Sequence, residues 1–122
     1  MVWAEELSIE GILRGLREGR TVVRIEGSEG PMIEMDLEGE RIGDTVMAER
    51  SVLRARVIGG VGSMLHLIRN GLVVEEIPID RDPFLYEREV IAPTSGEDRY
   101  RIEVVEGGRP RTIASHIWIS RP

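Results

Sequence analysis

The sequence predicts an all-β domain preceded by one short helix. Apolar residues recur at helical spacing up to Gly19, and from Thr21 onward they alternate with polar residues. Turn-forming clusters rich in Gly, Pro, Asn and Asp then follow about every 8 to 12 residues, which is typical of all-β domains. Strands joined by short turns, with no helix between them, indicate a sandwich or barrel of mainly antiparallel strands.

Residues 8–18 are predicted to form the helix. Ser8 stands at the N-cap position, and Gly19 fits the left-handed position that ends a helix. The apolar positions of this segment lie on one helix face: Ile9, Ile12, Leu13 and Leu16. A helix this short is marginal in water, so we expect its apolar face to dock on the sandwich or, as the alternative, on a second copy in a homodimer.

Strands are predicted wherever apolar and polar positions alternate, because alternate side chains of a strand point to opposite faces. The clearest stretches begin near Val23, Ile33, Leu53, Tyr100 and Ile113. The predicted core comprises Val23, Ile25, Ile33, Met35, Leu53, Ala55, Val57, Leu65, Leu67, Tyr100, Ile102, Val104, Ile117 and Ile119.

A hairpin is predicted around Asn70-Gly71, because this dipeptide accepts the positive φ angles of a two-residue turn. Residues 64–69 should then pair antiparallel with residues 72–77. The simple register places His66 opposite Glu75, and a bulge at the glycine would shift that pairing by one residue.

Cross-strand charge pairs are expected on the solvent face of the sheet. Glu34 and Asp36 alternate outward from one predicted strand, and Arg54 and Arg56 alternate outward from another. Opposite charges on neighbouring strands attract each other across the sheet.

Composition limits the classes of function. The 122 residues fit one domain, and the net charge of −6 is well mixed along the chain, which argues against nucleic-acid binding. No apolar run is long enough to span a membrane, and no signal peptide is recognisable, so a cytoplasmic location is slightly favoured. The chain contains neither cysteine nor lysine, which excludes disulfides, thiolate chemistry and Schiff bases.

Two histidines, His66 and His116, are present, and neither lies in an HxH, HxxH or HExxH motif. Because zinc sites usually take three or four protein ligands, we expect no metal ligand and no cofactor. His66 is predicted to be a half-exposed strand residue beside a glutamate. His116 shares a face with Trp118, where a surface histidine is expected and a small interaction patch is the alternative.

Two acidic pairs were considered as sites. Asp80 and Asp82 place carboxylates at alternate loop positions, but the full calcium signature is absent and Pro83 favours an ordinary turn. Glu75 and Glu76 are adjacent on a strand, so their side chains point to opposite sides and cannot form a carboxylate dyad.

The remaining candidates also favour a structural interpretation. The glycine-rich run at residues 59–62 joins two predicted strands without a following helix, so we expect a loop and not a phosphate site. No serine has the GxSxG context of a nucleophile: Ser8, Ser28, Ser51, Ser63, Ser95, Ser115 and Ser120. No catalytic residue is predicted, and the chain itself is expected not to be an enzyme.

The order of motifs resembles a known family. The motifs are SxExILxxLRxGRT, VVRIEGxEGP, Gly43-Asp44, LRARVIGGVGSMLHLIRNG, VVEEIPID, RYRIEV and IASHIWI. Together they resemble the C-terminal β-sandwich domain of PHP-type metal-dependent hydrolases, a family named after polymerase and histidinol phosphatase. Such proteins carry their metal ligands in an N-terminal barrel, and those motifs have no counterpart in this chain.

The resemblance implies an all-β, immunoglobulin-like antiparallel β-sandwich preceded by one short α-helix. Residues 1–20 would be a helical lead-in similar to the last barrel helix, and residues 21–122 the sandwich. The expected function is that of a non-catalytic accessory domain of a PHP-type metal-dependent phosphoesterase, with the PHP barrel of the parent chain as its partner. The alternative is a free-standing module that binds protein or carbohydrate. A small hydrolase in its own right is the least favoured interpretation, because no nucleophile, base or metal set is recognisable.

Overall fold

A computed structural model of the chain describes residues 22–25, 30–37 and 39–122. These residues form eleven β-strands and no helix. The predicted helix at 8–18 and the predicted lead-in at 1–20 lie outside the described residues. In chain order the strands are β1 (Val22–Arg24), β2 (Met32–Leu37), β3 (Glu40–Arg41), β4 (Thr45–Met47), β5 (Arg50–Ile58), β6 (Met64–Arg69), β7 (Leu72–Pro78), β8 (Phe84–Ile91), β9 (Glu97–Glu106), β10 (Arg109–Ala114) and β11 (Ile117–Ser120).

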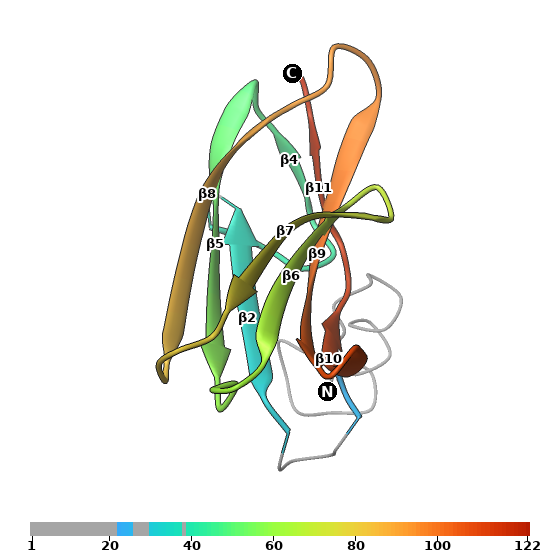
Figure 1. Ribbon diagram of the computed structural model, residues 1–122. Helices are drawn as coiled ribbons and strands as arrows, with labels where there is room; N and C mark the ends of the chain where they lie inside the picture. The colour runs from blue at the N-terminus through green and yellow to red at the C-terminus, as the bar shows by residue number, and fades with distance from the viewer. Residues whose placement is uncertain (1–21, 26–29, 38) are drawn as a thin grey trace, which may run out of the picture.

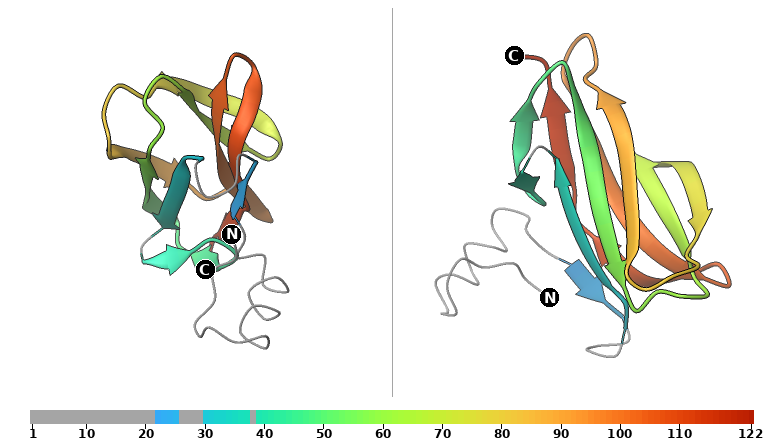
Figure 2. Two further views of the ribbon diagram at one scale, coloured as in Figure 1. Left: turned by 90° about the horizontal axis from the view of Figure 1, so that it is seen from below. Right: turned by 90° about the vertical axis from the view of Figure 1, so that its left-hand side faces the viewer.

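The strands form two sheets that pack face to face, as Figures 1 and 2 show, so the predicted all-β sandwich is confirmed. One sheet has the order β3-β2-β5-β8. The larger sheet has the order β1-β10-β9-β11-β4, with β6 pairing the long β9 and β7 pairing β6. The pairs are antiparallel except β11 with β4, which run parallel.

Most of the predicted core is confirmed. Apolar side chains from the facing surfaces of both sheets meet in one cluster, as expected for two amphipathic sheets. Buried as predicted are Ile33, Met35, Leu53, Ala55, Val57, Leu65, Leu67, Tyr100, Ile102, Val104, Ile117 and Ile119. Strand β8 adds Tyr86 and Val90, which no clear alternation had marked.

The first strand was predicted in the wrong phase. Val23 and Ile25 are 53% and 57% exposed, whereas Val22 is fully buried. Pairing with β10 explains the difference, because Val22 lies opposite the buried Ala114. The sequence offers apolar residues at both parities here, and the neighbouring strand selects one of them.

The alternating stretch that begins near Ile113 is divided between two strands in the structure. β10 buries Thr112 and Ala114, while β11 buries Ile117 and Ile119, so the buried parity changes between the two strands. Ile113 therefore lies on the opposite face from Ile117.

The predicted hairpin at Asn70-Gly71 is confirmed, with φ angles of 51° and 84° at the two turn residues. The simple register is wrong, because His66 lies opposite Glu76. The shift arises from an irregularity between Leu67 and Ile68 and not from a bulge at the glycine.

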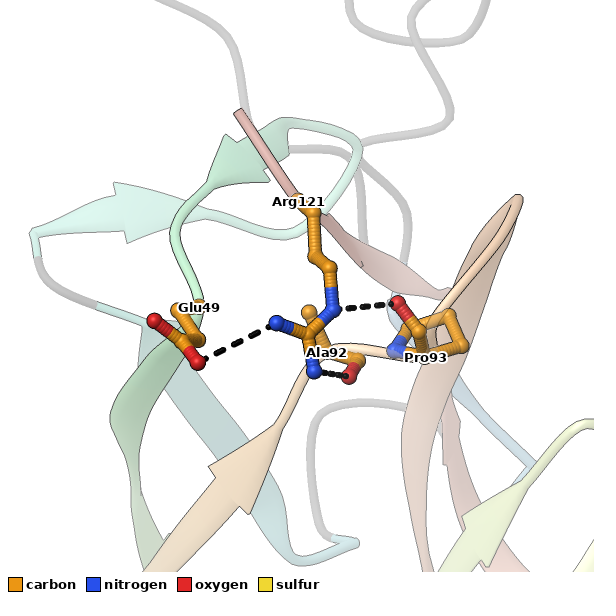
Figure 3. Close-up of polar contacts among 4 residues, drawn as sticks. All are labelled: Glu49, Ala92, Pro93 and Arg121. Atoms are coloured by element: carbon orange, nitrogen blue, oxygen red, sulfur yellow. Dashed lines mark hydrogen bonds and ion pairs between the residues drawn. The ribbon is translucent and has the colours of Figure 1, made fainter.

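The last strand is tied to the loops at one end of the sandwich by Arg121 (Figure 3). Its Nε donates to the carbonyl oxygen of Pro93 at 3.0 Å, and Nη2 donates to that of Ala92 at 3.4 Å. Its Nη1 lies 3.1 Å from Oε1 of Glu49. Because Glu49 precedes β5 and Ala92 follows β8, one guanidinium fixes the C-terminal end of the chain to the four-stranded sheet.

The predicted charge pairs occur in part on the outer face of the four-stranded sheet. Glu34 lies opposite Arg56, with 3.9 Å between Oε2 and Nη1. Asp36 lies opposite Arg54, but the Nε of Arg54 pairs with Oε1 of Glu87 on β8 at 3.2 Å. The arginines of β5 therefore contact carboxylates on both neighbouring strands.

Replacing both Arg54 and Arg56 by glutamine should change stability little. Their side chains are 54% and 50% exposed, and each exposed pair contributes about 0 to 1 kcal/mol. Urea unfolding should show a nearly unchanged midpoint. A loss of several kcal/mol would show that the ion pairs carry much more of the fold than their exposure implies.

Candidate functional site

His66 lies where the sequence analysis placed it, on a strand beside glutamates. It is a half-buried residue of β6, opposite Glu76 on β7 and opposite Glu103 on β9. Glu103 is bound to Arg101 in a close ion pair. A single imidazole between an exposed glutamate and a glutamate already paired with an arginine fits the structural interpretation.

His116 and Trp118 form a small aromatic patch on the larger sheet. Their ring centroids lie 5.7 Å apart and the rings are tilted by 49°. Burial lowers the pKa of His116 below its usual value, and the positive charges of Arg101 and Arg99 add to this effect. A hollow of about 260 Å³ beside His116 also contacts Val23 and Arg101.

The lowered pKa of His116 predicts a pH dependence of stability. The folded state favours the neutral ring, so the contribution of this ring is present above the unfolded pKa of about 6.5 and is lost as pH falls through the lower folded value. The free energy of unfolding should therefore fall more between pH 7 and pH 5 in the parent chain than in a His116→Asn variant. Equal pH slopes in urea titrations would contradict the prediction.

The carboxylates of Asp80 and Asp82 bind partners within the loops themselves. The Oδ1 of Asp82 accepts the backbone N–H of Gly59 at 3.0 Å, and Asp80 pairs with Arg81 at 3.2 Å. The glycine-rich run at 59–62 connects β5 to β6, so it is a loop between strands as predicted. Asp82 holds that loop against the one before β8.

Glu75 forms a polar contact between the two sheets that the sequence analysis did not anticipate. Its Oε1 accepts a close hydrogen bond from the hydroxyl of Tyr86 and lies 3.7 Å from Nη1 of Arg88. Burial and this hydrogen bond raise the pKa of Tyr86. Glu76 is exposed beside His66, so the two adjacent glutamates serve different faces, as predicted.

Two serines of the described residues contact neighbouring side chains, and a third is buried. The Oγ of Ser63 accepts from Nη1 of Arg111 at 2.9 Å, and the hydroxyl of Ser120 contacts the sulfur of Met47. The Oγ of Ser51 is buried with no hydrogen-bond partner in the part of the chain that the structure describes. Ser8 and Ser28 lie outside it.

Within residues 22–25, 30–37 and 39–122, no group of three or more His, Cys, Asp or Glu side chains could hold a metal ion. Over the same residues, no helix is long and apolar enough to cross a membrane.

A hollow of about 550 Å³ lies on the outer face of the four-stranded sheet. Outward-pointing side chains of β2, β5 and β8 line it, among them Glu34, Asp36, Arg54, Arg56, Leu85 and Glu87. Charges of both signs alternate across this surface, and Leu85 interrupts them with an apolar side chain.

Exposed apolar side chains occur on β7 and β8, which are edge strands of the two different sheets. The contact between Glu75 and Tyr86 shows that these two strands face each other (Figure 1). The exposed side chains are Leu72, Val73, Val74, Leu85 and Ile91. Leu85 and Ile91 share the outward parity of Glu87 and Glu89, so they lie on the outer face of the four-stranded sheet and point away from β7.

No protein-family model and no curated protein matches the chain. Among solved structures, the solution structure of a CARDB domain from Pyrococcus furiosus aligns with 75% of this chain and 96% of its own length, at a TM-score of 0.45 and 12% identity. An engineered protein aligns with 74% of this chain and 20% of its own length, at a TM-score of 0.47 and 12% identity. Neither likeness carries information about function.

Proposed function

We infer that this chain is a non-catalytic accessory domain that assembles with a protein partner. The observation that carries this inference is the exposure of several large apolar side chains on β7 and β8, edge strands of the two sheets. Leaving such side chains in water is unfavourable, and a partner that covers them would gain free energy from the burial.

The partner that we propose is the catalytic barrel of a PHP-type metal-dependent hydrolase. This step rests on the resemblance of the sequence motifs and not on the comparisons with known proteins. The immunoglobulin-like form of the sandwich belongs to the same proposal. Its support is the connectivity, in which β5 lies beside β8, β6 beside β9, and β4 runs parallel to β11.

A free-standing binding module is the second candidate. The hollow of about 550 Å³ on the outer face of the four-stranded sheet favours it, because a concave surface with several charged side chains can orient a ligand. Exposed aromatic rings, on which sugars usually stack, do not line this hollow within the described residues, so a peptide fits it better than a carbohydrate.

Two measurements test the accessory role. Sequencing of the genomic reading frame upstream of Met1 should reveal a barrel with HxH motifs in the same frame, and a stop codon directly before Met1 would contradict a single-chain parent. The isolated chain, purified without a tag, should contain zinc, manganese and iron far below one equivalent and hydrolyse no phosphoester. Stoichiometric metal that is lost in a His66→Ala or His116→Ala variant would overturn the proposal.

A further inference from the structure

The edge strands of this sandwich differ in how well they are protected against pairing with another chain. In the described part of the chain, β1, β3 and β4 are three residues long or shorter. β7 is longer, but its pairing with β6 is irregular and it ends in Pro78. Short length, irregular pairing and proline are the usual means by which proteins prevent edge-to-edge association.

Strand β8 lacks these three features, and its protection is limited to the charges of Glu87, Arg88 and Glu89. Its eight residues pair with β5 in an unbroken register, from Phe84 opposite Val57 to Ile91 opposite Arg50. No second strand pairs with β8 among the described residues. Half of its backbone N–H and C=O groups therefore face away from β5, in the geometry that an added strand requires.

The outward side chains of β8 form a regular pattern. Leu85 and Ile91 are 69% and 51% exposed, and between them stand Glu87 and Glu89. We propose that β8 is a docking edge for an extended strand of a partner protein that carries basic side chains opposite these two glutamates. This inference rests on the proposed function in that both require a protein partner.

A second copy of this chain fits the edge poorly in the registers that pair most of β8. Two-fold pairing of β8 with itself is antiparallel, and residues directly opposite each other must share a face. Registers centred on residues 87, 88 and 89 place, respectively, Glu87 opposite Glu87, Glu87 opposite Glu89, and Glu89 opposite Glu89. Like charges directly opposite each other are unfavourable, and this penalty falls on the registers centred on 87 and 88, which pair most of the strand, so a partner strand that differs from β8 fits the edge better.

The chain itself contains an example of the complementary pattern. Strand β5 lies along the paired edge of β8 and places Arg54 beside Glu87 and Arg50 beside Glu89, each with 3.2 Å between nitrogen and oxygen. Because a carboxylate has about four acceptor sites, both glutamates can accept a further arginine or lysine from the other side. The partner strand is therefore expected to alternate basic outward residues with apolar inward ones, as β5 does.

The apolar inward residues of the partner strand would also cover exposed surface of this chain. β7 and β8 face each other through Glu75 and Tyr86, so a strand added beside β8 would extend the four-stranded sheet along β7. On that side the partly buried Ile77 of β7 and Phe84 of β8 pack against the core and leave part of their apolar surface exposed. A partner strand could therefore bury apolar surface in addition to pairing its backbone.

A synthetic peptide with the sequence of residues 50–58, RSVLRARVI, is a direct probe of this edge. Fluorescence anisotropy of the labelled peptide should rise to saturation with added chain, and hydrogen exchange should slow at residues 84–91. A scrambled peptide of the same composition, and a Glu87→Arg/Glu89→Arg variant of the chain, should each bind at least about tenfold more weakly. The matched control variant, Glu76→Arg/Glu97→Arg, has the same net charge and should bind like the parent.

Several outcomes would overturn the proposal. Equal binding of the ordered and scrambled peptides would show general charge attraction. Loss of exchange protection in β5 would show strand displacement, and a dimer in sedimentation that protects β8 would show that a second copy occupies the edge.

Circular dichroism melting must first show that both variants are folded. Because the reading frame and the metal content do not involve β8, failure of the peptide to bind would leave the accessory role standing on its own tests.

Discussion

Replacing Leu67 by alanine should destabilise the chain by about 2 to 5 kcal/mol. Leu67 is fully buried on β6, opposite Ile102 of β9, which is equally buried. The substitution removes apolar burial and leaves a cavity that close-packed neighbours fill incompletely. Urea unfolding followed by circular dichroism would measure the loss.

Leu72→Ala is the matched control, since it is the same change on the neighbouring strand at a side chain that is 72% exposed. Substitution there should change the free energy of unfolding by about 0.5 kcal/mol or less. If the two variants unfold at the same urea concentration, the assignment of the inner face of β6 is wrong by one residue.

Gly60→Ala should cost about 1 to 3 kcal/mol through overpacking. A Cβ atom at this buried glycine would lie 2.8 Å from Cγ1 of Val57 and 3.2 Å from Cδ1 of Ile79. Val57 is fully buried and β-branched, so it has little freedom to move aside. The free energy of unfolding, measured in urea, should fall accordingly.

A double-mutant cycle tests the cause of the Gly60 effect. In a Val57→Ala background the closest contact is removed, so Gly60→Ala should cost less there than in the parent chain. Equal costs in both backgrounds would contradict a clash with Val57 and indicate that the backbone at residue 60 is responsible.

The hairpin and the central strands could be predicted because their signals are local. Asn70-Gly71 specifies its turn by the φ angles that the two residues accept, and clean alternation along β2 and β5 fixes their buried faces. Strand β8 could not be predicted in this way. Its apolar residues stand at both parities, so its inner face, with Tyr86 and Val90, is determined by pairing with β5.

The candidate site likewise has one part that could be predicted from the sequence and another that could not. From the sequence, neither the two histidines nor the loop aspartates show the spacing of a metal-site motif, and the expected absence of a metal ligand stays a prediction. The contact of Glu75 with Tyr86 and Arg88 could not be predicted, since it joins strands of different sheets. The open edge of β8 could likewise not be predicted, because the order of strands in the sheet determines which strand lies at an edge.

The sequence by itself determined that the body of this protein is a β-sandwich, where most of its strands lie, and which side chains of the cleanly alternating strands form the core. The physical reason is that strand alternation and turn chemistry act between residues close together in the chain. Tertiary structure alone decided the phase of β1, the parity change between β10 and β11, and the hairpin register. Each of these depends on which strand lies alongside, and that choice is made by packing between residues far apart in the sequence.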